Sequence, residues 1–267
     1  MRQRFSSFAA FIGFGQRRAR LEWWIMAFPL TIYALLVGVF ASIFAITPFE
    51  ELGKSDASGI TGARMVWYVA ITECVALATA GSFRDMRDIV LTGEYAASLH
   101  RPVSLMVLKT GEWIGRLSFD LPVFCLAATG LGLFFTGLFP FGPVQALFLG
   151  LSLMLSTLLL HWILAIVGLV EVWGPYGRPV YWIVQKVLFL LGGLILPIAL
   201  YPQAIAAAAW LTPFPAILTI PGRIAFDPAP AVLVAGVAIQ LFWLGVVGAL
   251  LAAVQTRANR IILWRGY

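Results

Sequence analysis

Long apolar stretches separated by shorter polar segments run through the whole sequence. A transmembrane helix needs about 20 mostly apolar residues, and six stretches reach this length, at about 23–46, 65–82, 118–139, 144–170, 181–201 and 231–254. The first stretch opens with Trp23 and Trp24, and aromatic residues of this kind are enriched where a helix enters a membrane. We therefore predict an all-α, polytopic membrane protein with six transmembrane helices.

Residues 1–22 precede the first stretch and have a different pattern. Phe8 and Phe11 recur near one side of a helix, while the arginines fall mostly elsewhere. This pattern predicts a short amphipathic helix in the cytoplasmic interface of the membrane, although two glycines in it are unfavourable for a helix. Residues 23–267 then make up the transmembrane domain.

The segment 83–117, between the second and third stretches, is polar and long for a connection in a helical bundle. Its start, "SFRDMRDIV", predicts a short helix with Phe83 and Met86 on one side and charges of both signs on the other. Glu94 begins a second short helix, which Pro102 ends because the residue before a proline disfavours helical backbone. Two interpretations stay open here: a solvated loop facing lipid headgroups, or a compact elbow with a mechanical role.

The segment 202–230, between the fifth and sixth stretches, is rich in proline and small apolar residues. It is too interrupted for one regular helix and too apolar for a solvated loop. Irregular backbone at membrane depth is tolerated where protein covers it. We therefore predict re-entrant or interfacial helices on the external side.

Composition and charge fit this picture. Hydrophobic residues make up 61% of the chain and charged residues 11%, far from the roughly 25% charged residues of soluble domains. All but three of the 18 Lys and Arg residues lie in alternate segments, the exceptions being Lys54, Arg64 and Arg223. The positive-inside rule then places both termini and 83–117 in the cytoplasm. We expect a multi-pass protein of the cell inner (cytoplasmic) membrane, with the lipid bilayer and no nucleic acid as partner.

Several motifs also resemble a known family. "GEYAASLHRPVS", then "LLGGLILPIALYPQAIAAAAWLTPFPAILTIPGRIAFDP", then "ANRIILWRGY" appear in order over nearly the whole chain. They resemble the six-span permease subunits of type-two ABC exporters, the ABC-2-type transporter family. Members share a Gly-Glu and Arg-Pro-Val element after the second span, a Gly-Gly and Pro stretch late in the fifth, a Pro-Phe external segment and a basic tail.

The resemblance implies a function and partners. The segment around 84–98 would be a coupling helix that docks on a separate ABC ATPase subunit, which would hold ATP and Mg. A second permease subunit, more often a different one, would complete the substrate pathway, and 202–230 would close its outer end. The predicted ATPase-coupling residues are Arg84, Asp85, Arg87, Asp88, Ile89, Gly93 and Glu94.

The chain offers little chemistry of its own. "LGKS" at 52–55 is not a phosphate-binding loop, because Pro48 stands where that motif requires Gly. Neither His100 nor His161 belongs to an H-E-x-x-H pattern, and the two cysteines lie in apolar runs typical of small core residues. We predict no catalytic residue, no metal and no cofactor bound by this chain, so ATP hydrolysis would belong to the partner subunits.

Two ionisable residues fall inside predicted spans, Glu73 in the second and His161 in the fourth. Such residues are costly in a bilayer and usually face a bundle interior or a cavity. Each could line the substrate pathway, pair across a subunit interface, relay a proton, or form a structural hydrogen bond. Asp120, near a span end, could instead pair with Arg116 at helical spacing. The cargo of the exporter would be hydrophobic or amphipathic. The alternative function is an ion-coupled secondary transporter or channel that uses Glu73.

Overall fold

The computed structural model describes residues 2–47, 61–101 and 103–265, and within these ranges the chain is helical with no β-strand. Five helical segments of the described chain are long and apolar enough to cross a membrane: Trp23–Ile46, Gly62–Leu91, Leu105–Thr136, Pro143–Val172 and Pro230–Trp264. The all-α prediction is therefore confirmed for the described residues, and these five segments agree with a multi-pass membrane protein, whereas six spans were predicted.

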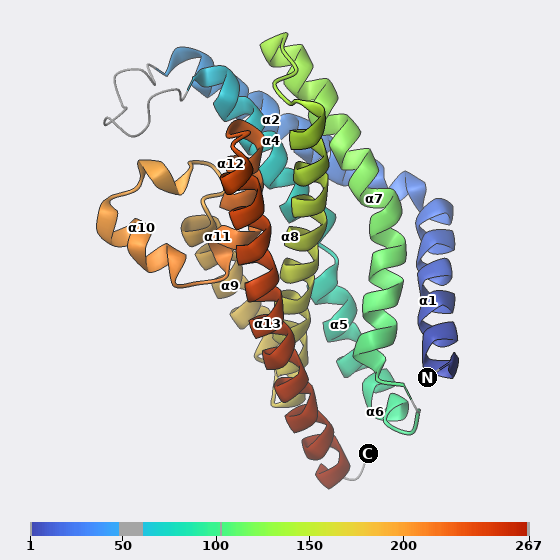
Figure 1. The fold of residues 1–267 in the computed structure, drawn as a ribbon. Helices are drawn as coiled ribbons and strands as arrows, with labels where there is room; N and C mark the ends of the chain where they lie inside the picture. Colours follow the sequence, from blue (N-terminus) through green and yellow to red (C-terminus); the bar gives the residue numbers. More distant parts are fainter. Residues whose placement is uncertain (1, 48–60, 102, 266–267) are drawn as a thin grey trace.

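The helices follow one another in the order that Figure 1 shows by colour. The first half of the chain contains α1 (Arg2–Leu21), η1 (Trp23–Met26), α2 (Ala27–Ile46), α4 (Gly62–Ala78), α5 (Ser82–Leu91), α6 (Glu94–Ser98) and α7 (Leu105–Thr136). The second half contains α8 (Pro143–Leu169), η2 (Val170–Val172), α9 (Gly177–Gly192), η3 (Ile198–Leu200), α10 (Gln203–Trp210), α11 (Phe214–Ile217), α12 (Thr219–Phe226) and α13 (Pro230–Arg265).

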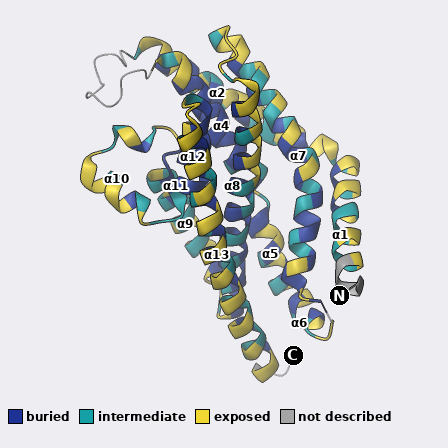
Figure 2. Ribbon diagram, viewed as in Figure 1, coloured by how far each residue is buried: buried dark blue, intermediate teal, exposed yellow. Residues whose placement is uncertain are grey.

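Two helices form the centre of the molecule. The apolar windows of Gly62–Leu91 and Pro143–Val172 are 72% and 61% buried, whereas that of Pro230–Trp264 is only 22% buried. α8 packs against α13, α5 and α12, and α4 packs against α7 and α2, so the buried residues gather along α4 and α8 (Figure 2). The outer helices expose large apolar side chains such as Phe28, Leu126 and Phe242, as expected where lipid or another subunit covers the surface.

α7 begins well before the apolar stretch predicted for it. The stretch starts near 118, but the helix starts at Leu105, so 83–117 contains α5, α6 and the first turns of α7. These added turns pack along α1 (Figure 1). Because α1 covers them, the helix continues through residues whose hydropathy alone does not predict a span.

The predicted continuous helix at 181–201 is interrupted. α9 has 16 residues and ends at Gly193, which adopts the left-handed conformation with φ 72°. A Cβ atom at this position would lie 2.9 Å from the Leu196 carbonyl oxygen, so glycine is required for the turn. Local backbone geometry therefore ends α9 although the sequence remains apolar.

The proline-rich segment 202–230 forms the short helices α10, α11 and α12, which agrees with the predicted helical pieces. Pro202 directly precedes α10 and Pro215 lies in the first turn of α11, positions at which proline's missing N–H costs nothing. Both chain ends lie at the same end of the molecule as α5 and α6, and the α7–α8 connection lies at the opposite end (Figure 1).

Candidate functional site

α5 is attached to the helix bundle through its inner face. Met86 and Ile89 are buried in a cluster with side chains of α8 and α13. Beside them, Arg87 Nε donates a 2.8 Å hydrogen bond to Oε1 of Glu171, whose side chain is only 2% exposed. The inner face therefore combines apolar contacts with a largely buried ion pair.

α6 and the residues after it are attached to α13. The Tyr95 hydroxyl donates to Asn259 Oδ1 at 2.7 Å, and Gln255 Nε2 donates to Ser104 Oγ at 2.6 Å. Burial raises the pKa of Tyr95 to about 12, although the Gln255 side chain opposes the shift. The phenol consequently stays protonated at neutral pH and can keep donating to Asn259.

The predicted coupling residues separate into three places. Arg87 and Ile89 face inward and are used by the bundle. We define the exposed tip of α5 and α6 as the five exposed residues Asp88, Leu91, Thr92, Gly93 and Glu94. Gly93 allows this tip to turn sharply, since its φ is 76°.

The remaining two predicted residues, Arg84 and Asp85, lie in the first turn of α5, where both are exposed. Neither forms an ion pair or a side-chain hydrogen bond with another described residue. Together with Arg116 and Asp120 they line a cavity of about 290 Å³, whose other lining residues are mostly apolar and include Phe28. Arg116 and Asp120 form an ion pair at 3.1 Å, as their spacing predicted.

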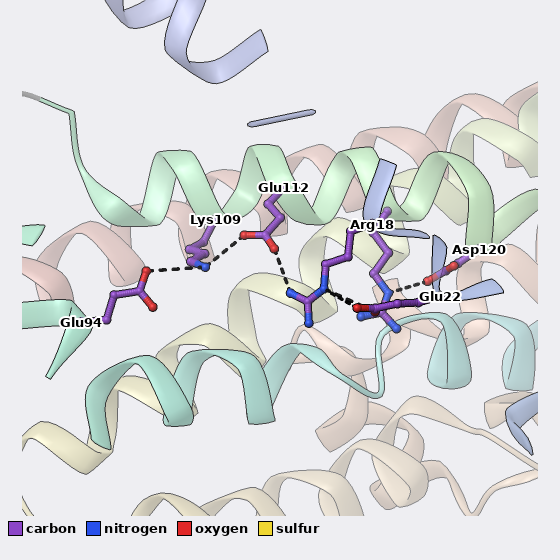
Figure 3. Close-up of polar contacts among 7 residues, drawn as sticks. Arg18, Glu22, Glu94, Lys109, Glu112 and Asp120 are labelled. Atoms are coloured by element: carbon purple, nitrogen blue, oxygen red, sulfur yellow. Dashed lines mark hydrogen bonds and ion pairs between the residues drawn. The ribbon is translucent and has the colours of Figure 1, made fainter. Parts of the chain in front are cut away.

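A second cavity, of about 280 Å³, lies between α1, α5, α7 and α8. Alternating charges connect its walls (Figure 3): Lys109 contacts Glu94 at 3.9 Å and Glu112 at 3.0 Å, and Glu112 contacts Arg18 at 3.1 Å. Burial alone would lower the pKa of Arg18, but Glu22 and Glu112 outweigh burial and raise the pKa above its ordinary value. Arg18 therefore remains charged and connects α1 to α7.

His161 lies at the wall of this second cavity and is 5% exposed. Its Nδ1 is 3.0 Å from Ser82 Oγ, and its ring stacks on Trp113 with centroids 4.3 Å apart and an interplanar angle of 11°. One side chain of α8 thus contacts the start of α5 and the first third of α7. This geometry agrees with the structural hydrogen bond among the roles considered for His161, and sequence spacing gave no signal for Ser82 or Trp113 as its partners.

Glu73 lies elsewhere. It is 6% exposed on α4, lines neither of the two cavities, and makes no hydrogen bond or ion pair with the described residues. Of these two residues, only His161 lines either of the two cavities described above. In the part of the chain that the structure describes, no group of three or more His, Cys, Asp or Glu could hold a metal ion. The "LGKS" sequence at 52–55 lies outside the described residues.

No protein-family model matches this chain, and a comparison with curated proteins finds no match either. The geometry described above is therefore the main guide to function. Its clearest feature is a pair of short helices, α5 and α6, whose inner faces are fixed to α8 and α13 while their tip is exposed.

Proposed function

We propose that the protein is the membrane permease subunit of an ATP-driven exporter, with separate ABC ATPase subunits docking on the exposed tip of α5 and α6. The observation that carries this proposal is the contrast between the two faces of this helix pair. Met86, Ile89 and Tyr95 are buried against the bundle, whereas Asp88 and Leu91 are exposed. A stiff element with fixed inner contacts and polar outer contacts suits the transmission of movement from a partner.

The contacts of α5 explain how such a movement would reach the spans. Glu171 receives Arg87 and belongs to η2, directly after α8, and Ser82 contacts His161 inside α8. α5 also follows α4 after only three residues. A displacement of α5 would therefore act on the two most buried helices, α4 and α8, rather than being lost in a flexible loop.

A six-span topology fits this function. α9 and residues 193–201 after it would together take the place of the fifth span and leave α10 on the external side. Six crossings would then place both chain ends on one side of the membrane. The termini, α5 and α6 lie at the same end of the molecule (Figure 1), and the segments at that end carry the excess of Lys and Arg. Both observations support a location of this end on the cytoplasmic side of the inner membrane.

The exposed apolar faces of α2, α7 and α13 leave room for a second permease subunit, which the family resemblance suggests is a different chain. The cavity beside Arg84 is lined by both charged and apolar residues, which favours a hydrophobic or amphipathic cargo. ATP and Mg would be bound by the ATPase partners and no cofactor by this chain.

The test is co-purification from the native membrane in mild detergent. We expect an ATPase to co-purify with the tagged wild-type chain and to be lost in the variant Asp88→Ala/Leu91→Ala, which removes one charge and one exposed apolar side chain from the tip. The co-purifying proteins are identified by mass spectrometry.

The matched control is Arg17→Ala/Leu21→Ala on α1. It also removes one charge and one exposed apolar side chain, but away from the tip, and should retain the ATPase. Equal loss in both variants would argue against docking on the tip, and the absence of any ATPase with the wild type would contradict the exporter proposal.

One observation favours the alternative, an ion-coupled transporter or channel. Glu73 is buried on a central helix without a hydrogen bond or ion pair among the described residues, and such a carboxyl group can bind and release a cation or proton. If no ATPase co-purifies, ion flux that reconstituted wild-type protein supports and Glu73→Gln abolishes would establish this alternative.

A further inference from the structure

A narrow groove lies between α12 and the first turns of α13, away from α5 and α6. Its volume is about 180 Å³. Ile220 and Ile224 form one wall, and the small residues Ala231, Ala235 and Gly236 form much of the other. Gly236 is close to the first wall, since a Cβ atom there would lie 3.0 Å from Ile220 Cγ2. The small side chains of α13 therefore create the groove.

Among the described residues that line this groove, Arg223 is the one that carries a charge. Its guanidinium carbon lies 5.9 Å from the centre of the Trp210 ring, a cation–π contact. Asp227 is one turn further along, and its Oδ1 accepts a hydrogen bond from the backbone N–H of Ala229 at 3.0 Å. Arg223 forms no ion pair with any residue that the structure describes.

The groove is held in shape from behind. Gln145 of α8 is buried and its Nε2 donates hydrogen bonds to the carbonyl oxygens of Ile224 and Ala225, at 3.0 and 2.6 Å. These bonds satisfy carbonyl groups in the last turn of α12 and attach that turn to α8. The wall that carries Arg223 is consequently preformed.

We propose that this groove binds an anionic phospholipid, with the phosphate on Arg223 and the upper part of one acyl chain between α12 and α13. An unpaired guanidinium provides several N–H donors for phosphate oxygens, and the indole of Trp210 suits the membrane interface. The other described lining residues are all apolar, with no acidic residue among them, which favours an anionic headgroup over a zwitterionic one. The volume is too small for a whole lipid, so the rest of the molecule remains in the bilayer.

Native mass spectrometry of the purified full chain in detergent tests the site, with phosphatidylglycerol and phosphatidylcholine of identical acyl chains as the probes. We expect the wild type to retain one phosphatidylglycerol in preference to phosphatidylcholine. Arg223→Gln should weaken phosphatidylglycerol binding about tenfold, the loss of one charge-assisted contact, and remove the preference. Unchanged binding in Arg223→Gln would overturn the proposal.

Two controls separate this site from general charge and surface effects. Arg64→Gln removes another exposed arginine, at the end of α4 away from α5, and should retain the preference. Ala235→Leu fills the groove and should reduce binding of both lipids, whereas Ala238→Leu, also exposed on α13 but outside the groove, should not. A specific site would be contradicted if Arg64→Gln changed lipid binding as much as Arg223→Gln, or if Ala238→Leu changed it as much as Ala235→Leu.

Neither the groove nor Arg223 belongs to α5 or α6. Lipid binding is measured on the chain without an ATPase, so its failure and the failure of ATPase docking are distinguishable.

Discussion

At the scale of single residues, the ion pair between Arg87 and Glu171 decides how α5 is attached. The Glu171 side chain is 2% exposed while that of Arg87 is 25% exposed. Gly177 packs directly on Glu171, since a Cβ atom there would lie 2.8 Å from Glu171 Oε1. The carboxylate is therefore enclosed and depends on Arg87 for compensation, whereas Arg87 can still reach water.

Arg87→Ala should therefore be strongly destabilising. Removing one partner of a buried pair leaves an uncompensated charge and costs about 3–5 kcal/mol, so the melting temperature of the purified protein in detergent should fall by several degrees. Arg84→Ala is the matched control, because Arg84 is exposed on the same helix and unpaired among described residues; it should change stability by less than about 0.5 kcal/mol. The double variant Arg87→Ala/Glu171→Gln should recover part of the lost stability. Equal melting temperatures for Arg87→Ala and its control Arg84→Ala would refute the role of the ion pair.

At the scale of elements, α1 and α7 approach so closely that their backbones touch. A Cβ atom on Gly15 would lie 2.0 Å from the Glu112 carbonyl oxygen, and one on Gly115 would lie 2.0 Å from the Ile12 carbonyl oxygen. A Cβ atom on Gly111 would lie 3.0 Å from carbon atoms of the Phe8 ring. The "GEWIG" sequence of α7 thus acts as a small-residue contact surface of the kind that joins helices in membranes.

Gly15→Ala should loosen α1 from α7, because an added methyl group meets a carbonyl oxygen and overpacking of this kind costs about 1–3 kcal/mol. Gly13→Ala is the matched control: nothing lies within 4 Å of its Cβ position, and alanine is the better helix former. Limited trypsin digestion reads out the difference, since α1 contains Arg17, Arg18 and Arg20. Cleavage should accelerate in Gly15→Ala alone, and similar rates in both variants would show that the close contact is unimportant.

At the scale of the whole molecule, the chain ends and the tip of α5 and α6 lie together (Figure 1). Five described segments meet the length and hydropathy of a span, while α9 stops after 16 residues. An even number of crossings is needed to place both termini on one side of a membrane. The proposed topology therefore requires α9 and residues 193–201 after it to complete one further crossing.

Cysteine labelling in intact cells tests that topology. Both native cysteines are free and are first replaced by alanine, after which Leu91→Cys, Ala204→Cys and Thr256→Cys are made singly at exposed positions. A membrane-impermeant maleimide should label Ala204→Cys on α10 in intact cells, but the other two only after permeabilisation. Labelling of all three on the same side would contradict a crossing by α9 and residues 193–201.

The candidate site, like the ends of the helices, could be predicted only in part, because both depend on contacts between residues that are distant in the sequence. "SFRDMRDIV" correctly predicts a short helix with Phe83 and Met86 inward, because amphipathic spacing is a local property. It does not separate Arg87, which meets Glu171 84 residues away, from Asp88, which is exposed. The same limit applies to Ser82, whose partner His161 is 79 residues distant.

The sequence by itself determined that the chain is an all-α membrane protein, because apolar runs of span length and the scarcity of charge depend on composition and order alone. Only the tertiary structure decided that α7 starts at Leu105, where α1 covers its first turns, and which charged residues of α5 face inward. It also decided that Arg223 lines an apolar groove, because α12 and α13 are brought together there. Hydropathy is a sum over neighbours in the chain, whereas burial and pairing depend on neighbours in space.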